Sequence, residues 1–261
     1  MTPATRASSV PAKRLLAVTM GLALALTGCS APAASEVPSP SPTTSQAEPT
    51  AIAAAPVSGT GPTGFPGVDF PIPDDARSVT IDFECADGVY TVELGDSMML
   101  GQGPLFGTCD GVVPLSWPIT ERTGPTLSVG VADGVDWSAT PRFSTDEFAY
   151  DSALTADCER FAGVYSALMN ADSGYTHYSA FDETEWAARV DRATEELATL
   201  ASTAKSDLAA SFRMLESMVR DPDRAVGAAA STVAFQEATG GISQACNANH
   251  TPVILSAEFG G

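Results

Sequence analysis

The sequence predicts an α+β fold, in which a small all-β, sandwich-like domain is followed by a four-helix up-down bundle. Residues 66–144 consist of short stretches in which apolar and polar residues alternate, separated by turns rich in Gly and Pro, and this pattern is typical of β-strands. From residue 145 to residue 250 the apolar residues recur every three or four positions, as they do along the buried face of a helix. Two cysteines in each region are a third observation, because they allow one disulfide in each.

Two turn motifs organise the β region. Residues 79–94 alternate between apolar and polar on both sides of Asp87-Gly88, and residues 127–139 do so around Asp133-Gly134. An Asp-Gly pair between two alternating runs is a strong signal for a tight β-hairpin turn. We therefore expect one hairpin at each motif, and a set of such short strands favours a sandwich.

Four amphipathic segments follow. The second has an acidic first turn, which suits a helix N-terminus. Asp223 is expected to cap the fourth, and Gly240-Gly241 is expected to interrupt it. Short connections between four such helices favour an up-down-up-down bundle over residues 145–250. The segments are 153–169, 182–204, 208–219 and one that starts at Arg224.

The cysteines test this organisation. Apart from Cys29 near the N-terminus there are four, Cys85, Cys109, Cys158 and Cys246, and four cysteines allow three connectivities. Cys85 and Cys109 lie in the same β region, so their pairing is the economical choice. Cys158 lies near the start of the first helix and Cys246 near the end of the last, and in an up-down-up-down bundle these points meet at one end. We expect two structural disulfides and no metal site, because the chain has no CxxC or close Cys/His pair.

The N-terminus has the features of a targeting segment. Three basic residues lie in the first fourteen positions, and an uncharged apolar stretch follows over residues 15–28. A basic region followed by an apolar region is typical of a secretory signal peptide. Fourteen residues at 1.5 Å each are too few to cross a hydrocarbon core of roughly 30 Å, so a permanent transmembrane helix is not expected.

The end of this segment, Leu26-Thr27-Gly28-Cys29, resembles the lipobox of bacterial lipoproteins, in which an aliphatic residue and two small residues precede a cysteine. The resemblance implies that the signal peptide, residues 1–28, is cleaved after Gly28 and that the Cys29 thiol carries a diacylglyceryl group. Acyl chains such as palmitate would then hold the protein on the extracytoplasmic face of the cell membrane, since each buried CH₂ contributes roughly 0.8 kcal/mol.

Residues 29–65 are expected to form a disordered tether, because their Pro, Ser, Thr and Ala content offers little apolar surface to bury. Residues 251–261 are expected to form a C-terminal tail. The lipobox, this tether, the scarcity of lysine (only Lys13 and Lys205) and the paired cysteines resemble secreted lipoproteins of actinobacteria. That resemblance implies a cell-envelope location.

The charge excludes one class of partner. The chain has 13 Lys and Arg against 32 Asp and Glu, a net charge of −19. Nucleic-acid binding depends on basic residues that neutralise phosphates, so nucleic acid is not an expected partner. The membrane is expected to be contacted through the lipid on Cys29.

Residues that could carry chemistry are scarce, and no catalytic residue, metal ligand or cofactor is predicted. The most aromatic stretch of the helical region contains Tyr175, His177, Tyr178 and Phe181. These side chains could line a ligand groove, or they could cover one end of the bundle core.

Two functions are therefore compatible with the sequence. The first is a non-enzymatic, lipid-anchored binding module for an envelope protein, a glycan or a small ligand. The second is an envelope hydrolase that uses a pair of carboxylates, which would have to converge in one cleft. The acidic residues fall mostly at turns, helix caps and polar helix faces, which favours the binding module.

Overall fold

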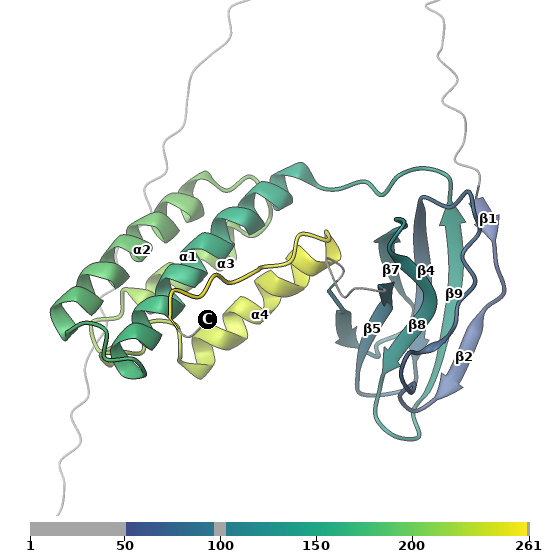
Figure 1. Cartoon of the computed structure of the whole chain (residues 1–261), viewed down its shortest axis with the longest axis horizontal. Coiled ribbons are helices and arrows are strands. Elements are labelled where there is room, and N and C mark those ends of the chain that lie inside the picture. Colours follow the sequence, from purple (N-terminus) through teal and green to yellow (C-terminus); the bar gives the residue numbers. More distant parts are fainter. Residues whose placement is uncertain (1–50, 97–102, 260–261) are drawn as a thin grey trace, which may run out of the picture. The chain divides into compact units, whose positions relative to one another are not determined.

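Two antiparallel β-sheets followed by four helices make up the described part of the chain, residues 51–96 and 103–259 of a computed structural model (Figure 1). The predicted α+β class is therefore confirmed. In sheet A, β1 and β2 both pair with β9, β9 pairs with β4, and β4 pairs with β7. Sheet B has the order β3-β8-β5-β6. The strands are β1 (Ala51–Ala53), β2 (Val57–Thr60), β3 (Val68–Asp69), β4 (Ser78–Cys85), β5 (Val89–Asp96), β6 (Leu105–Thr108), β7 (Val113–Pro118), β8 (Thr123–Gly130) and β9 (Asp136–Ser144).

The two sheets bury their apolar residues in one common core. Alternate residues of the longer strands are buried, for example Val79, Ile81 and Phe83 of β4 in sheet A and Val92 and Leu94 of β5 in sheet B. Residues of both sheets belong to a single cluster of contacting apolar side chains. The period-2 pattern of the sequence therefore identified the buried face of the strands correctly.

Both hairpin predictions are wrong. The turn at Asp87-Gly88 joins β4 of sheet A to β5 of sheet B, and the turn at Asp133-Gly134 joins β8 of sheet B to β9 of sheet A. Each turn carries the chain from one sheet to the other. Both glycines have positive φ, 84° and 79°, as Asp-Gly turns require. Alternation shows only that one face of each strand is buried. Two strands that lie in different sheets bury this face against the same core as the two strands of a hairpin would.

The predicted tether is also ordered at its C-terminal end. Residues 51–53 form β1 and residues 57–60 form β2, and both strands pair with β9. Trp137 of β9 explains part of this order, because its Nε1 donates a hydrogen bond to the Gly61 carbonyl at 2.9 Å. A Cβ at Gly59 would lie 2.7 Å from the Trp137 ring, so glycine is needed there. Main-chain pairing does not require the large side chains whose absence predicted disorder. Residues 29–50 lie outside the described part.

The helices are α1 (Ser152–Thr176), α2 (Glu183–Thr203), α3 (Ala209–Val219) and α4 (Val233–Ala248). Helix α1 contacts α2 and α4, and α3 also contacts α2 and α4. Within the described residues, no helix is both long and apolar enough to cross a membrane.

Helix α4 differs from its prediction at two points. It begins at Val233, where the Thr232 hydroxyl accepts a hydrogen bond from the Phe235 amide, and Asp223 instead lies in the preceding turn. Gly240-Gly241 does not interrupt the helix. Each glycine costs about 1 kcal/mol relative to alanine, and burial of Phe235 and Ile242 on the other face offsets this cost.

Both predicted disulfides are confirmed. Cys85 at the end of β4 is bonded to Cys109 just after β6, so this bond joins sheet A to the end of a sheet B strand. Cys158 of α1 is bonded to Cys246 of α4. Each bond therefore joins parts of the fold that are distant in the sequence.

Candidate functional site

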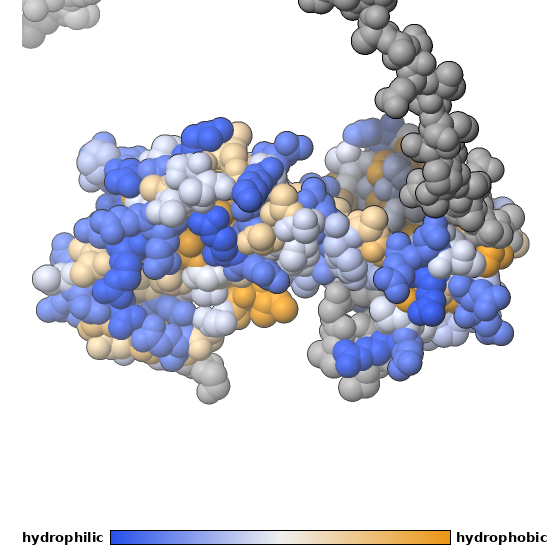
Figure 2. Space-filling view, turned by 90° about the horizontal axis from the view of Figure 1, so that it is seen from above, coloured by the Kyte–Doolittle hydropathy of each residue, from blue (hydrophilic) through white to orange (hydrophobic). Residues whose placement is uncertain are grey.

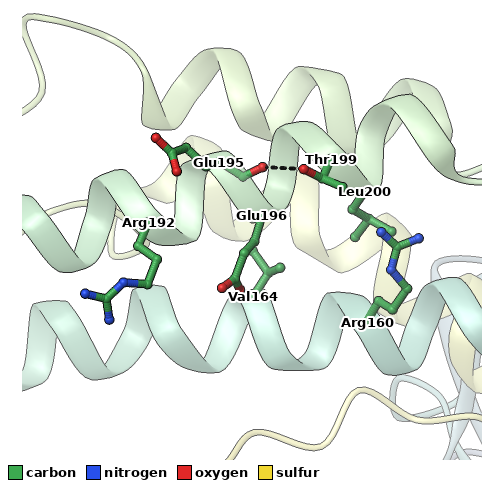
Figure 3. Close-up of a pocket in the computed structure, with 7 residues that line it drawn as sticks. All are labelled: Arg160, Val164, Arg192, Glu195, Glu196, Thr199 and Leu200. Carbon is green, nitrogen blue, oxygen red and sulfur yellow. Dashed lines mark hydrogen bonds between the residues drawn. The ribbon is translucent and has the colours of Figure 1, made fainter.

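A groove of about 440 Å³ lies between α1 and α2 (Figure 3). Its lining residues recur three or four positions apart along each helix, which places them on the facing sides of two neighbouring helices. Val164 and Leu200 are buried and form its apolar part. The lining residues are Arg160, Val164, Arg192, Glu195, Glu196, Thr199 and Leu200.

Charged side chains dominate this groove. In Figure 3, Arg192 and Arg160 lie toward opposite ends, and Glu196 lies between them. Arg160 Nη1 donates to the Thr203 hydroxyl at 3.0 Å and lies 4.0 Å from a carboxylate oxygen of Asp157. By contrast, no hydrogen bond or ion pair joins the Arg192 guanidinium to any other residue of the described part.

A second hollow of about 180 Å³ continues this groove, since both are lined by Arg192 and Glu196. It contains Arg189, whose Nε donates to Glu185 at 2.9 Å and whose Nη1 donates to Glu258 at 2.8 Å. The hydrogen bond to the Glu258 carboxylate is the main cause that raises the pKa of Arg189. We call the two hollows together the arginine groove.

Glu258 belongs to the C-terminal tail, which is not separate from the helices. After α4 the chain runs back along them (Figure 1), and Asn170 of α1 holds its main chain. The Asn170 amide donates to the Ser256 carbonyl at 2.8 Å, and its oxygen accepts from the Glu258 amide at 2.9 Å. The Ser256 amide also donates to the Ser166 hydroxyl at 3.0 Å. The helices therefore bind an extended peptide of their own chain, and the arginine groove takes its carboxylate.

The four aromatic-stretch residues singled out from the sequence lie at the end of α1 and just after it, and none of them lines the arginine groove. Tyr175 is half-buried beside Trp186. His177 is the exposed C-cap residue of α1. Tyr178 and Phe181 pack against Phe259 of the tail, with ring centroids 5.7 and 6.0 Å away.

Two buried carboxylates on α1 have structural partners. The Asp157 carboxylate accepts from the amides of Lys205 and Ser206 and from the Ser206 hydroxyl, all within 3.0 Å. It thereby fixes the connection between α2 and α3. Fifteen positions further along α1, a rise of about 22 Å, Asp172 fixes the connection between α3 and α4 by accepting from the amides of Ala229 and Ala230. The two carboxylates are therefore too far apart to act as a pair in one cleft.

Hydrophilic residues cover much of the face shown in Figure 2. On the face shown in Figure 2, hydrophobic residues appear in small separate groups. Within residues 51–96 and 103–259, no three His, Cys, Asp or Glu side chains are grouped as metal ligands. The arginine groove was not predicted from the sequence, although Arg189 and Arg192 lie three residues apart on a helix in a chain with only 13 Lys and Arg.

No protein-family model matches this chain, and no curated protein sequence matches it. The geometry described above is therefore the basis for any assignment of function.

Proposed function

We propose that this chain is a lipid-anchored lipoprotein of the extracytoplasmic cell envelope, and that its helices bind an acidic, extended segment of another envelope protein without catalysing a reaction. The observation that carries the proposal is the state of two neighbouring arginines. Arg189 already holds the carboxylate of Glu258 from an extended segment, while Arg192, three residues away, has no partner in the described part of the chain.

The chemistry of the arginine groove suits a peptide. Arg192 and Arg160 offer guanidinium donors, which bind carboxylates in a planar, paired geometry. Glu196 lies between them and, like the neighbouring Glu195, is exposed and can accept hydrogen bonds from a ligand. An extended peptide provides acidic side chains for the arginines and main-chain N–H groups for Glu196. The net charge of −19 slows the approach of an acidic partner, so contacts within the groove have to supply the selectivity.

The anchoring part of the proposal rests on the lipobox, since Cys29 lies outside the described residues. The two disulfides support it, because such bonds form and persist mainly in oxidising, extracytoplasmic compartments. We also propose that the two sheets are the two layers of a β-sandwich, and their common core supports this arrangement. We take the four helices as an up-down-up-down bundle, supported by the cyclic contacts of α1, α2, α3 and α4.

The alternative that the sequence allowed, a hydrolase with two carboxylates, lacks specific support. A retaining or inverting glycosidase needs two carboxyl groups about 5 to 10 Å apart. The buried carboxylates of Asp157 and Asp172 lie about 22 Å apart by helix rise, and main-chain amides occupy both. We therefore propose binding alone.

Mass spectrometry of the protein from its own membrane tests the anchor. We expect a mature chain that begins at Cys29, carries acyl chains and has four hydrogens fewer than the reduced form, because of its two disulfides. Cys29→Ala should release the protein from the membrane. An unmodified Cys29 in the native protein would refute the anchor.

Binding of a labelled peptide of alternating Glu and Ser, followed by fluorescence anisotropy at low salt, tests the groove. We expect the double variant Arg160→Gln/Arg192→Gln to bind about tenfold more weakly, since two ion pairs of up to about 1 kcal/mol each are lost. Arg220→Gln, which changes an exposed arginine at the C-cap of α3, is the matched control and should bind normally. Equal affinity of the double variant and the wild type would refute the assignment.

A further inference from the structure

A second cavity, unrelated to the arginine groove, has an apolar lining. It measures about 410 Å³ and lies where β5, β6 and β7 meet α4, all within one compact unit of the fold. Leu105, Leu115 and Phe148 are among its walls, and no charged side chain of the described part lines it. Ligand pockets in proteins span about 300 to 1,000 Å³ and are mostly apolar with a few polar groups. In a chain with 32 acidic residues, an uncharged cavity of this size calls for an explanation.

Tyr90 of β5 is the first polar group of this cavity. Its side chain is only 4% exposed and lines the cavity, yet its hydroxyl has no hydrogen-bond partner in the described part of the chain. This oxygen is not among the described side-chain atoms that are both closed off from solvent and without a partner, so water can reach it through the cavity, and an acceptor on a ligand would take the place of that water. Burial also raises the pKa of this phenol, so it remains protonated and can donate.

The neighbouring strand leaves room for this hydroxyl. A Cβ at Gly107 of β6 would lie 2.6 Å from the Tyr90 oxygen, so any other residue there would displace the ring. The position of the phenol therefore depends on a glycine in the paired strand, since Tyr90 and Gly107 are directly opposite each other.

Asn247 of α4 supplies the second polar group. It lines the cavity, and its side-chain amide has no hydrogen bond within residues 51–96 and 103–259. Its place on α4 is fixed from two sides. The adjacent Cys246 is bonded to Cys158, and Gln244 Nε2 donates to the Phe106 carbonyl of β6 at 2.7 Å.

We propose that this cavity binds a small, uncharged, ring-containing ligand, whose carbonyl or other acceptor oxygen receives hydrogen bonds from the Tyr90 hydroxyl and the Asn247 amide. The apolar walls exclude charged ligands, because a charge buried there would lose its hydration without a partner. The two free donors select for an acceptor atom on an otherwise apolar molecule. This site is independent of the arginine groove, and neither proposal depends on the other.

A matched pair of probes tests the proposal. Acetophenone and ethylbenzene have similar shapes, and only acetophenone has an acceptor oxygen. Each is titrated into the otherwise complete chain with Cys29→Ser, and the methyl signals of Leu105 and Leu115 and the Asn247 side-chain amide are followed by NMR. We expect both probes to shift the methyl signals, and acetophenone alone to shift the Asn247 amide.

Variants separate recognition from simple partitioning. Tyr90→Phe should weaken acetophenone binding about fivefold, the effect of losing one neutral hydrogen bond, and should leave ethylbenzene unchanged. Tyr178→Phe changes an exposed tyrosine and serves as the control. Ala248→Trp, which adds bulk at a lining position, should abolish binding of both probes. The proposal is overturned if neither probe shifts the methyl signals, or if Tyr90→Phe binds acetophenone as the wild type does.

Discussion

Replacing Asp172 should destabilise the helices more than replacing an exposed carboxylate does. Asp172 of α1 is 4% exposed, and its two oxygens accept three hydrogen bonds. One oxygen accepts from Trp186 Nε1 at 3.0 Å and from the Ala229 amide at 2.9 Å, and the other accepts from the Ala230 amide at 2.8 Å. This carboxylate therefore connects α1 to α2 and to the segment that precedes α4.

The geometry sets the expected magnitudes. Asp172→Ala leaves three buried donors unsatisfied, at a cost of about 1 to 3 kcal/mol each. Part of this cost is offset because the variant no longer buries a charged carboxylate, so we expect the free energy of unfolding to fall by about 4 kcal/mol. Asp172→Asn keeps one oxygen, which can still accept from Trp186 and Ala229. Its NH₂ group then faces the Ala230 N–H, donor against donor, so we expect a loss of about 2 kcal/mol.

Guanidinium chloride unfolding, followed by circular dichroism at 222 nm, measures these losses. Asp191→Asn, which removes a charge from an exposed position on α2, is the control and should change the free energy of unfolding by less than about 0.5 kcal/mol. A loss below about 1 kcal/mol for Asp172→Ala would show that the three hydrogen bonds contribute little net stability, and the reasoning would be refuted.

Three further predictions concern the helices and the tail. Burial lowers the pKa of His250, so the unfolded chain binds a proton at this side chain more readily than the folded chain does. The free energy of unfolding should therefore fall as the pH drops below about 6.5, in total by about 1.4 kcal/mol for each pH unit by which folding lowers this pKa. This pH-dependent part should be absent in His250→Asn when the two urea unfolding curves are compared. Replacing both Cys158 and Cys246 by Ser opens a loop with a sequence separation of 88 and should cost about 4.5 kcal/mol by the chain-entropy model, measurable as a lower denaturation midpoint. Gly174→Ala places a Cβ 2.5 Å from the Phe181 ring and 2.7 Å from the Phe259 ring, which pack against each other. The substitution should therefore displace both rings, release the end of the tail and speed hydrogen exchange at the Glu258 amide, while unchanged exchange would contradict the packing described.

The sequence predicted those features that depend on side chains alone. Period-2 and helical patterns identified the buried residues of the strands and helices, and the positions of Cys158 and Cys246 at the ends of the first and last helices predicted their bond. The pattern could not say which sheet a strand joins, because Val79 and Val92 face the same core from different sheets.

The features that were missed depend on contacts between distant residues. β2 is held by main-chain pairing with β9, and its sequence has no large side chain that would predict a strand. The tail is held by Asn170, a polar residue with no distinctive motif around it. The arginine groove requires α1 and α2 to lie side by side, so that Arg160 and Arg192 line one hollow. The period of each helix alone does not reveal that arrangement.

The connections that cross between the sheets have a consequence for how this chain folds. Most strand pairs join strands that are not consecutive in the chain, since β4 pairs with β7 and β9 and β5 pairs with β8, whereas β5 and β6 are consecutive. Moreover, β1, β2 and β4 each pair with β9, the last strand of the chain, which ends at Ser144. The β region therefore has a high contact order, which is associated with slow folding. Sheet A cannot close until residue 144 has been synthesised and is free to fold, so its unpaired strands need protection from aggregation until then.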